Sequence, residues 1–190
     1  LSKKTIYKNL TVSKFGNILE YNIKDQKITN KSFFNIFKLI NKKKYLSFQK
    51  KTFSGISTEL ESLMKKKLNL MVPNRKFASI FTGGVDSSVI SALLNKLKKP
   101  NLLACLDHKN KDNTISKTKI MSRNLDSVFF PLNMTSKKYF EYFKKVYVLL
   151  CHPFSTHDFI GRFQISEYLK RKKCKVYFVG DGADELFGGY

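Results

Sequence analysis

The sequence predicts an α/β fold, namely a doubly wound, mostly parallel sheet with helices on both faces, preceded by a short β-rich lead-in. From about residue 55, short apolar runs alternate with longer segments whose apolar residues recur at helical spacing. Such alternation is typical of right-handed βαβ units that build a parallel sheet. Two glycine-rich segments each follow an apolar run directly, as loops at the carboxyl ends of strands do. We therefore expect a lead-in over residues 1–54 and an α/β domain over residues 55–190.

The lead-in is predicted to contain one hairpin and a linker. Residues 7–12 and 18–23 alternate loosely between apolar and polar side chains, and Phe15-Gly16-Asn17 supplies a turn signal between them. These two segments are therefore expected to pair as antiparallel strands. Residues 42–51 are rich in lysine and are expected to form a linker.

The α/β domain is predicted to alternate helices with four strands. Thr58 and Glu61 can form a capping box for a first helix that runs to Leu68. Thr135 can cap a later helix that runs to Leu149. The strands are expected at residues 77–81, 102–106, 127–130 and 176–179, and the remaining helices at residues 89–97, 114–123 and 160–172.

The composition is that of a folded domain. The chain has 190 residues, of which 42% are hydrophobic, and 17 Phe and 9 Tyr supply bulk for a core. No apolar run approaches the roughly 20 residues that a membrane helix needs, and the start shows no signal-peptide pattern. The three cysteines, Cys105, Cys151 and Cys174, form neither a metal-binding pattern nor a disulfide framework. We therefore expect reduced thiols, no membrane partner and a cytoplasmic location.

The net charge of +22 raises the question of a nucleic-acid partner. Only four of the 36 basic residues are arginine, the residue best suited to bidentate contacts with phosphates and bases. The lysines are scattered along the chain in short groups. We therefore expect solvated lysine faces and no nucleic-acid partner, with a polyanion-binding surface as the alternative.

The first glycine-rich segment, residues 82–88, has the features of a phosphate-binding loop. Gly83 and Gly84 let the backbone approach an anion, and the amides that open the following helix favour negative charge. A carboxylate at Asp86 would repel a bare phosphate, but it can hold a Mg²⁺ ion that bridges to phosphate oxygens. The alternative is an ordinary turn in which Asp86 caps the helix.

The second glycine-rich segment, residues 180–190, concentrates carboxylates in a basic chain. Asp181, Asp184 and Glu185 are three of only 14 acidic residues. Carboxylates crowded into one loop repel each other unless a cation or a hydrogen-bond donor compensates them, which favours a metal or polar substrate site. The alternative is a solvated acidic turn whose last two acids begin a helix. Because both glycine-rich segments follow strands of one sheet, they can face the same Mg²⁺ ion.

The two segments together resemble the signatures of the asparagine synthetase family, the glutamine-dependent amidotransferases with an N-type ATP pyrophosphatase domain of the PP-loop superfamily. The first signature, S-G-G-x-D-S-S, is matched by residues 82–88 with Thr82 in place of the first Ser. The second, G-[DE]-G-x-D-E-[LV]-F-G-G-Y, is matched throughout residues 180–190. The resemblance covers residues 55–190, and the lead-in is similar to the segment that joins the family's glutaminase and synthetase domains.

The resemblance implies a role for each matched residue. Asp86 and Asp184 would be the Mg²⁺ ligands, and Asp181 and Glu185 would be catalytic acids near the acyl-adenylate. The stretch Ser155-Thr156-His157-Asp158 lies near the family's substrate-binding loop. The residues implied to bind ATP and its pyrophosphate are Ile80, Phe81, Thr82, Gly83, Gly84, Val85, Asp86, Ser87, Ser88, Ala104, Val179 and Gly180.

The implied reaction is the adenylation of a carboxylate, that of aspartate, followed by attack of ammonia and release of AMP and pyrophosphate. It implies ATP, Mg²⁺, aspartate and ammonia from glutamine, a glutaminase domain in the same protein, and a homo-oligomer. Neither the family's N-terminal nucleophilic Cys nor its late catalytic Lys has a counterpart in this sequence. We therefore expect a fragment that is truncated at both ends and does not turn over by itself.

Three alternatives to this function remain open at the level of sequence. A relative in the same family could act on another carboxylate or on a sugar. A PP-loop enzyme that modifies tRNA shares the first signature but not the second. An inactive regulatory relative is also conceivable, although the acids of both signatures are intact.

Overall fold

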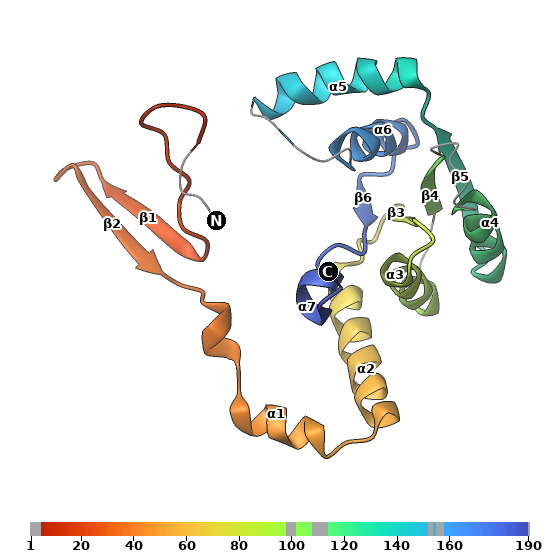
Figure 1. Ribbon diagram of the computed structural model, residues 1–190, viewed down its shortest axis with the longest axis horizontal. Helices are drawn as coiled ribbons and strands as arrows, with labels where there is room; N and C mark the ends of the chain where they lie inside the picture. The colour runs from red at the N-terminus through yellow and green to blue at the C-terminus, as the bar shows by residue number, and fades with distance from the viewer. Residues whose placement is uncertain (1–4, 98–101, 108–113, 152–153, 155–157, 190) are drawn as a thin grey trace. The chain divides into compact units, whose positions relative to one another are not determined.

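The structure is a computed structural model that describes residues 5–97, 102–107, 114–151, 154 and 158–189. The chain divides into two compact units, Leu1–Ser57 and Thr58–Tyr190. Each unit is described by itself below. Figure 1 shows the helices and strands of both.

The first unit contains an antiparallel hairpin, but not between the predicted partners. Strand β1 (Asn17–Asn22) pairs with β2 (Lys27–Ser32) in a register that sets Asn22 opposite Lys27. The turn forms because the side-chain oxygen of Asn22 accepts hydrogen bonds from the backbone amides of Lys24 and Asp25, at 2.9 and 3.4 Å. The prediction of a strand at residues 18–23 is confirmed, whereas its pairing with residues 7–12 is wrong.

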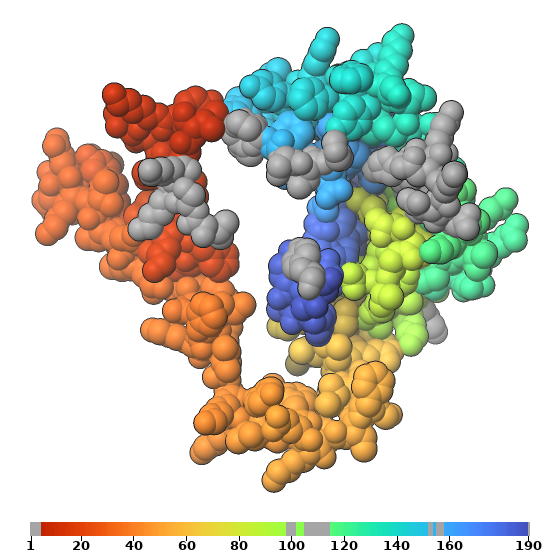
Figure 2. All heavy atoms as spheres, viewed as in Figure 1, coloured from red at the N-terminus to blue at the C-terminus, as the bar shows by residue number. Residues whose placement is uncertain are grey.

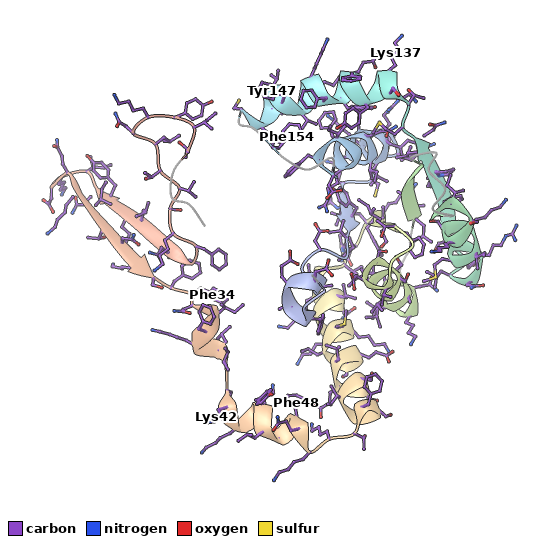
Figure 3. All side chains as sticks on the ribbon, in the orientation of Figure 1. Phe34, Lys42, Phe48, Lys137, Tyr147 and Phe154 are labelled. Carbon is purple, nitrogen blue, oxygen red and sulfur yellow. The ribbon has the colours of Figure 1, made fainter. Side chains whose placement is uncertain are left out.

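The lysine-rich stretch after the hairpin is helical rather than an open linker. A 3₁₀ turn (Ile36–Leu39) is followed by α1 (Lys42–Gln49), and the Asn41 side chain caps α1 by accepting from the Lys44 amide at 3.0 Å. The Lys51 ammonium lies 4.9 Å from the ring centroid of Phe48, which is labelled in Figure 3. The prediction of a linker at residues 42–51 is therefore wrong. None of the described residues between 5 and 57 is buried.

Helix α2 (Phe53–Met71) begins earlier than the sequence predicts. The side chain of Thr52 accepts a hydrogen bond from the amide of Gly55 at 3.2 Å, which is the geometry of a helix cap. Thr58 lies inside the helix, so the predicted capping box of Thr58 and Glu61 is wrong. Thr52 and Thr58 are both residues that commonly cap helices, and the structure shows that Thr52 is the one at the start of α2.

The second unit is built on a four-stranded parallel sheet of order β5-β4-β3-β6. This arrangement confirms the predicted α/β fold with a mostly parallel sheet. All four predicted strands and all predicted helices of this domain are present, with shifts of a few residues at their ends. The strands are β3 (Phe77–Ile80), β4 (Leu102–Asp107), β5 (Val128–Asn133) and β6 (Val176–Phe178); the helices after α2 are α3 (Val85–Lys96), α4 (Thr114–Asn124), α5 (Ser136–Leu150), α6 (Asp158–Arg171) and α7 (Ala183–Phe187).

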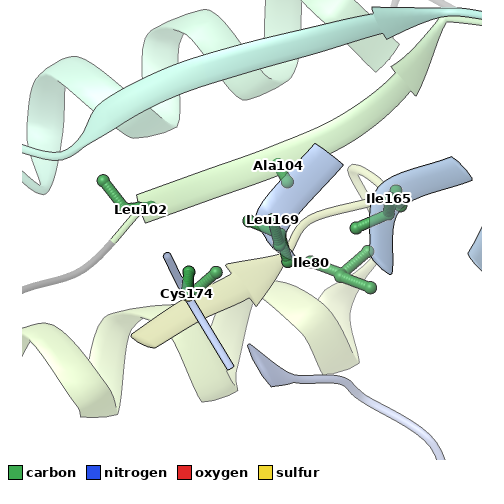
Figure 4. Packing of buried hydrophobic residues seen from close by; sticks show 7 residues of the cluster. Ile80, Leu102, Ala104, Ile165, Leu169 and Cys174 are labelled. Carbon is green, nitrogen blue, oxygen red and sulfur yellow. The ribbon is translucent and has the colours of Figure 1, made fainter. Parts of the chain in front are cut away.

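Helices cover both faces of this sheet. On one face, Ile165 and Leu169 of α6 pack against the side chains shown in Figure 4, which include Ile80, Leu102 and Ala104. On the other face, Leu93 and Leu94 of α3 and Leu68 of α2 pack with Phe77 and Phe178, whose ring centroids are 5.6 Å apart. The split follows from the alternation of side chains along β3, where residues 78 and 80 face α6 and residue 77 faces α3.

Helix α5 lies against α6 and fixes its position. Thr135 caps α5 by accepting from the Lys138 amide at 3.3 Å, as predicted. The Tyr142 hydroxyl donates to the carboxylate of Glu167 on α6 at 2.8 Å. A chain of ring contacts runs from Tyr147 through Phe143 to Phe154, just before α6 (Figure 3). Phe154 in turn contacts Phe159 in the first turn of α6, with ring centroids 5.8 Å apart, so α5 and the start of α6 are joined.

Two findings bear on the predicted environment of the chain. In the stretches that the structure describes, no helix combines the length and apolar character needed to cross a membrane. Cys151 is exposed and Cys174 is buried, and neither forms a disulfide within the part of the chain that the structure describes. The side chain of Cys105 lies outside the described residues.

The order of the strands sets β3 and β6 side by side at a topological switch point. The chain runs from β3 to β4 and then to β5 on one side, and returns to add β6 on the other side of β3. The connection from β3 to β4 and the connection from β5 to β6 therefore run in opposite directions along the sheet. Ligands of open parallel sheets bind at such a switch point. Both glycine-rich segments begin here.

Candidate functional site

The first glycine-rich segment folds back onto the first turn of α3. Gly83 has a φ of +85°, a conformation that favours glycine. The amide of Thr82 donates to the hydroxyl oxygen of Ser87 at 3.2 Å, and that hydroxyl donates to the carbonyl of Gly84 at 3.2 Å. A third contact of 3.2 Å joins the hydroxyls of Thr82 and Ser87. These bonds hold the segment in a tight turn at the carboxyl end of β3.

The first turn of α3 carries no side-chain cap. Gly84 occupies the capping position, and among the described residues no side chain makes a capping hydrogen bond to the helix. Asp86 is the second residue of the helix, so the alternative in which Asp86 caps it is wrong. The uncapped amides and the positive end of the helix dipole give this turn an affinity for anions.

The second glycine-rich segment turns from β6 into the short helix α7. Gly182 caps α7 with a φ of +90°, and Gly188 ends it with a φ of +75°. Asp184 and Glu185 lie in the first turn of α7, which agrees with one feature of the acidic-turn alternative. Their side chains nevertheless line the cleft described below.

The two glycine-rich segments touch each other at Gly180. A Cβ atom at this position would lie 2.9 Å from the Cβ of Asp86 and 2.9 Å from the backbone nitrogen of Ser87. No side chain fits into that space, so glycine is what lets the segments meet. Figure 2 shows the blue C-terminal segment packed directly against the yellow-green segment that contains the start of α3.

A cleft of about 680 Å³ opens where the two segments meet. The end of β3, the first turn of α3, one face of α6 and the second segment form its walls. Its lining residues are Ile80, Phe81, Thr82, Gly84, Asp86, Ser87, Asp158, Gly161, Arg162, Ile165, Val179, Gly180, Asp181, Gly182, Asp184 and Glu185. A cleft of this size is in the range of small-molecule sites.

Most of the predicted site residues lie in this lining, but four do not. Val85 points outward and is 76% exposed. The Ser88 hydroxyl donates to the carbonyl of Gly84 at 2.6 Å. Ala104 is fully buried, and its carbonyl accepts from the Phe81 amide at 2.9 Å. Gly83 shapes the turn without lining the cleft. The structure thus brings eleven of the fifteen predicted residues to one cleft, while their functional roles stay predictions.

The cleft is acidic although the chain is strongly basic. Five carboxylates and one guanidinium line it, within a chain of net charge +22. Among the described residues, no hydrogen bond or ion pair engages the side chain of Asp86 or Asp184, and both are exposed. Within that described part, no group of three or more His, Cys, Asp or Glu side chains has a metal-binding arrangement. Mg²⁺ takes one or two carboxylates together with phosphate oxygens and water, so this oxygen donor set fits the ion.

Arg162 of α6 is the charged residue of this cleft that sequence reasoning missed. Its guanidinium forms a two-bond fork with the carboxylate of Asp181, with Nη2 donating to Oδ1 at 2.8 Å and Nη1 donating to Oδ2. This bond raises the pKa of Arg162 above its ordinary value. The signal that could have found it is the scarcity of arginine, since Arg162 is one of only four in the chain.

The predicted substrate stretch is described only at its last residue. Asp158 begins α6 and lines the cleft, whereas residues 155–157 lie outside the described residues. Gly161 and Ile165 add the small and apolar surface of α6 to the same wall. They follow Asp158 at helical spacing, which explains why one helix face supplies them all.

Comparisons with solved structures give distant matches. One is NMN synthetase from Francisella tularensis, 18% identical with a TM-score of 0.48 over 74% of this chain and 59% of that one. Another is NH3-dependent NAD synthetase from Campylobacter jejuni in complex with the nitrate ion, 14% identical with a TM-score of 0.48 over 74% of this chain and 61% of that one.

Sequence comparisons are more specific. Asparagine synthetase [glutamine-hydrolyzing] of Gallus gallus is 26% identical over an alignment of 150 residues that covers 72% of this chain and 25% of that protein. The chain thus spans about a quarter of the length of this relative. The family model for asparagine synthase matches residues 59–190, which include the whole cleft. The chain belongs to the asparagine synthase family.

Proposed function

We propose that the chain forms the ATP-binding part of a ligase that amidates a carboxylate, with aspartate as the acceptor. Family membership supports ATP-dependent amidation in general. The single observation that carries the proposal is the contact of the two glycine-rich segments at Gly180, which joins both family signatures in one cleft at the switch point of the sheet. The reaction would form an acyl-adenylate and release AMP and pyrophosphate.

The first glycine-rich segment would hold the pyrophosphate of ATP. Its support is the uncapped first turn of α3, which forms a wall of the cleft at Gly84, Asp86 and Ser87. The hydroxyl of Thr82 adds a donor at the same place. Ile80, Phe81 and Val179 line the cleft next to it and offer apolar surface for the adenosine.

Asp86 and Asp184 would hold Mg²⁺ between the two segments. Both are exposed, line the cleft and belong to the segments that meet at Gly180. The ion would neutralise the negative charge of the leaving pyrophosphate. The two carboxylates would fix its position relative to the amides of α3, so that positioning and charge compensation provide most of the catalysis.

Asp181 and Glu185 would act in the second half of the reaction. Ammonia must lose a proton as it attacks an acyl-adenylate, and a carboxylate in the cleft can accept that proton. Both side chains line the cleft, and Asp181 is held toward α6 by Arg162. Their assignment as catalytic acids is part of this proposal.

Glutamine is the proposed source of ammonia in the complete protein. The name of the Gallus gallus relative says that it hydrolyses glutamine, and the chain spans a quarter of that relative. We assign residues 1–54 to a lead-in from a glutaminase domain on the same polypeptide. The homo-oligomer and the cytoplasmic location expected from the sequence likewise stay predictions.

The products of ATP consumption test this proposal. The complete protein would be incubated with Mg²⁺, ATP, an ammonium salt and a carboxylate, and exchange of labelled pyrophosphate into ATP would be followed alongside AMP formation. Exchange that requires aspartate, and AMP with pyrophosphate as products, are expected. Release of ADP and phosphate would contradict an adenylate.

A panel of acceptors separates the proposed substrate from its rivals. Aspartate, other carboxylates, an amino sugar and tRNA would be compared in the same exchange assay. Exchange that depends on another carboxylate or on the sugar would keep the site and change the acceptor. Exchange that depends on tRNA would replace the proposal with a tRNA-modifying activity.

A further inference from the structure

Arg162 holds a special position in the cleft because it supplies the positive charge on its wall. It lies one helical turn after Asp158 on α6 and faces the second glycine-rich segment. Among the residues that line the described cleft, the other charged side chains are the five carboxylates. Among the charged side chains of the described cleft, this guanidinium is therefore the one that attracts an anionic substrate entering without a metal ion.

The fork between Arg162 and Asp181 has the geometry of a ligand contact. The planar guanidinium presents two parallel N–H groups to two oxygens of one carboxylate, with Nη2 and Oδ1 2.8 Å apart. A substrate carboxylate or a phosphate can be held in the same way. The Asp181 carboxylate thus occupies the place that an oxyanion of the substrate would take.

This pair is accessible and replaceable. The side chain of Arg162 is 41% exposed and that of Asp181 is 53% exposed, so solvent reaches both partners. Exposed ion pairs contribute little to the stability of a protein, because water and salt screen them. An incoming oxyanion can therefore exchange with Asp181 at small cost.

We propose that Arg162 is the oxyanion receptor of the cleft, and that Asp181 holds its guanidinium in position until an oxyanion of the substrate takes over the fork. The chemistry of the ligand is a carboxylate or a phosphate group. Which of the two it is rests on the proposed function, in which the acceptor brings a carboxylate and ATP brings phosphates. The exchange also releases Asp181 from Arg162 at the moment when substrate is bound.

The side-chain signals of arginine test this directly. The chain has only four arginines, Arg75, Arg123, Arg162 and Arg171, so few Nε–Hε signals appear in a ¹⁵N NMR spectrum. Arg162→Lys identifies the signal of interest. Titrations in Mg²⁺-free buffer would use sodium L-aspartate in one series and ATP in the other.

We expect the Arg162 signal to shift in a saturable way and the other three to shift less. A response to aspartate alone identifies the receptor with the acceptor carboxylate, and a response to ATP alone identifies it with a phosphate. An Arg162 signal that moves with neither probe overturns the proposal. The shifts are measured on the wild-type protein, and the Arg162→Lys variant serves only to assign the signal.

A comparison of two carboxylate removals gives the second test. Asp181→Asn frees the fork, whereas Asp158→Asn removes a negative charge from the same cleft at a side chain that no described hydrogen bond joins to Arg162. We expect Asp181→Asn to tighten binding of the responding probe by about twofold to fivefold, the equivalent of an exposed ion pair. Asp158→Asn is expected to have the smaller effect of general charge reduction.

The double variant completes the cycle. In the Arg162→Gln background, Asp181→Asn should tighten binding of the probe no more than Asp158→Asn does, because no guanidinium is left to free. Equal effects of both removals in the wild-type background would contradict the proposal. Binding of Mg²⁺–ATP is measured in parallel for the wild-type protein and for Arg162→Gln. If both bind Mg²⁺–ATP while the Arg162 signal of the wild-type protein responds to neither probe, the receptor proposal alone is refuted. If the wild-type protein does not bind Mg²⁺–ATP, the proposed function is refuted.

Discussion

Gly180 lies so close to Ser87 that a Cβ atom at position 180 would come within 2.9 Å of the Ser87 backbone nitrogen. The two residues are far apart in sequence, yet each follows a strand of the same sheet, and those strands are neighbours. The contact is what turns two separate glycine-rich segments into one cleft.

Gly180→Ala is expected to push the two segments apart. The added methyl would meet the backbone of α3, which cannot move aside as a flexible side chain can, so we expect a loss of about 1–3 kcal/mol in the free energy of unfolding. Gly84→Ala is the matched control, because its φ is −83° and its Cβ would meet only the Thr82 hydroxyl at 3.6 Å. Urea denaturation measures both variants, and equal losses would contradict this account of the contact.

The hydroxyls of Ser79 and Ser91 join β3 to α3 inside the core. Their oxygens are 2.8 Å apart, and both residues are fully buried. Ser91→Ala leaves the Ser79 hydroxyl without its partner, which should cost about 1–3 kcal/mol of unfolding free energy. Chemical denaturation with urea measures this loss.

The double variant distinguishes a broken pair from two independent losses. Replacing Ser79 and Ser91 together removes both polar groups, so it should cost clearly less than the two single losses added. Strict additivity would show that the hydroxyls do not depend on each other.

The carboxylate of Glu61 makes stability sensitive to acid. Lys96 and Lys65 approach it within 2.8 and 2.9 Å and lower its pKa from 4.5 to about 2, chiefly through the bond from Lys96. Since the pKa is lower in the folded state, the stabilisation is complete above pH 4.5 and is lost as the pH falls through about 2.

The melting temperatures of the wild-type protein and of Glu61→Gln test this sign. Their difference should be largest near neutral pH and should shrink as the pH falls from 4.5 toward 2. High salt should also reduce it, because the three side chains are exposed. A difference that grows in acid would mean that the carboxylate is not held in its charged form.

The sequence predicts the second unit well because its signals are local. The apolar run at residues 77–80 is buried throughout, and Thr135 caps the helix that it precedes. The first unit is predicted poorly because its elements have no buried face. Asn41 caps a lysine-rich helix without an apolar stripe, and Asn22 builds the hairpin turn through side-chain bonds that the alternation pattern does not contain.

The residues of the site likewise include some that local sequence signals predict and others that depend on the arrangement of the strands. Asp86 and Asp184 stand inside local glycine-rich signatures, so their neighbourhood follows from the residues beside them. Arg162 enters the cleft only because β6 returns beside β3 and brings Asp181 to α6. The contact between Arg162 and Asp181 depends on the order of the strands in the sheet, and it produces no periodic pattern in the sequence. Ala104 is a residue that the resemblance assigns to ATP binding but that is fully buried and does not line the cleft.

The affinity for ATP with and without Mg²⁺ tests the central claim most directly. We predict that Mg²⁺ tightens ATP binding to the wild-type protein, and that Asp86→Asn and Asp184→Asn each weaken binding of Mg²⁺–ATP by at least about tenfold, or about 1.4 kcal/mol. Asp126→Asn, which removes an exposed carboxylate outside the cleft, should bind as the wild type does. Binding that ignores Mg²⁺, or that survives both substitutions, would contradict the assignment of the cleft.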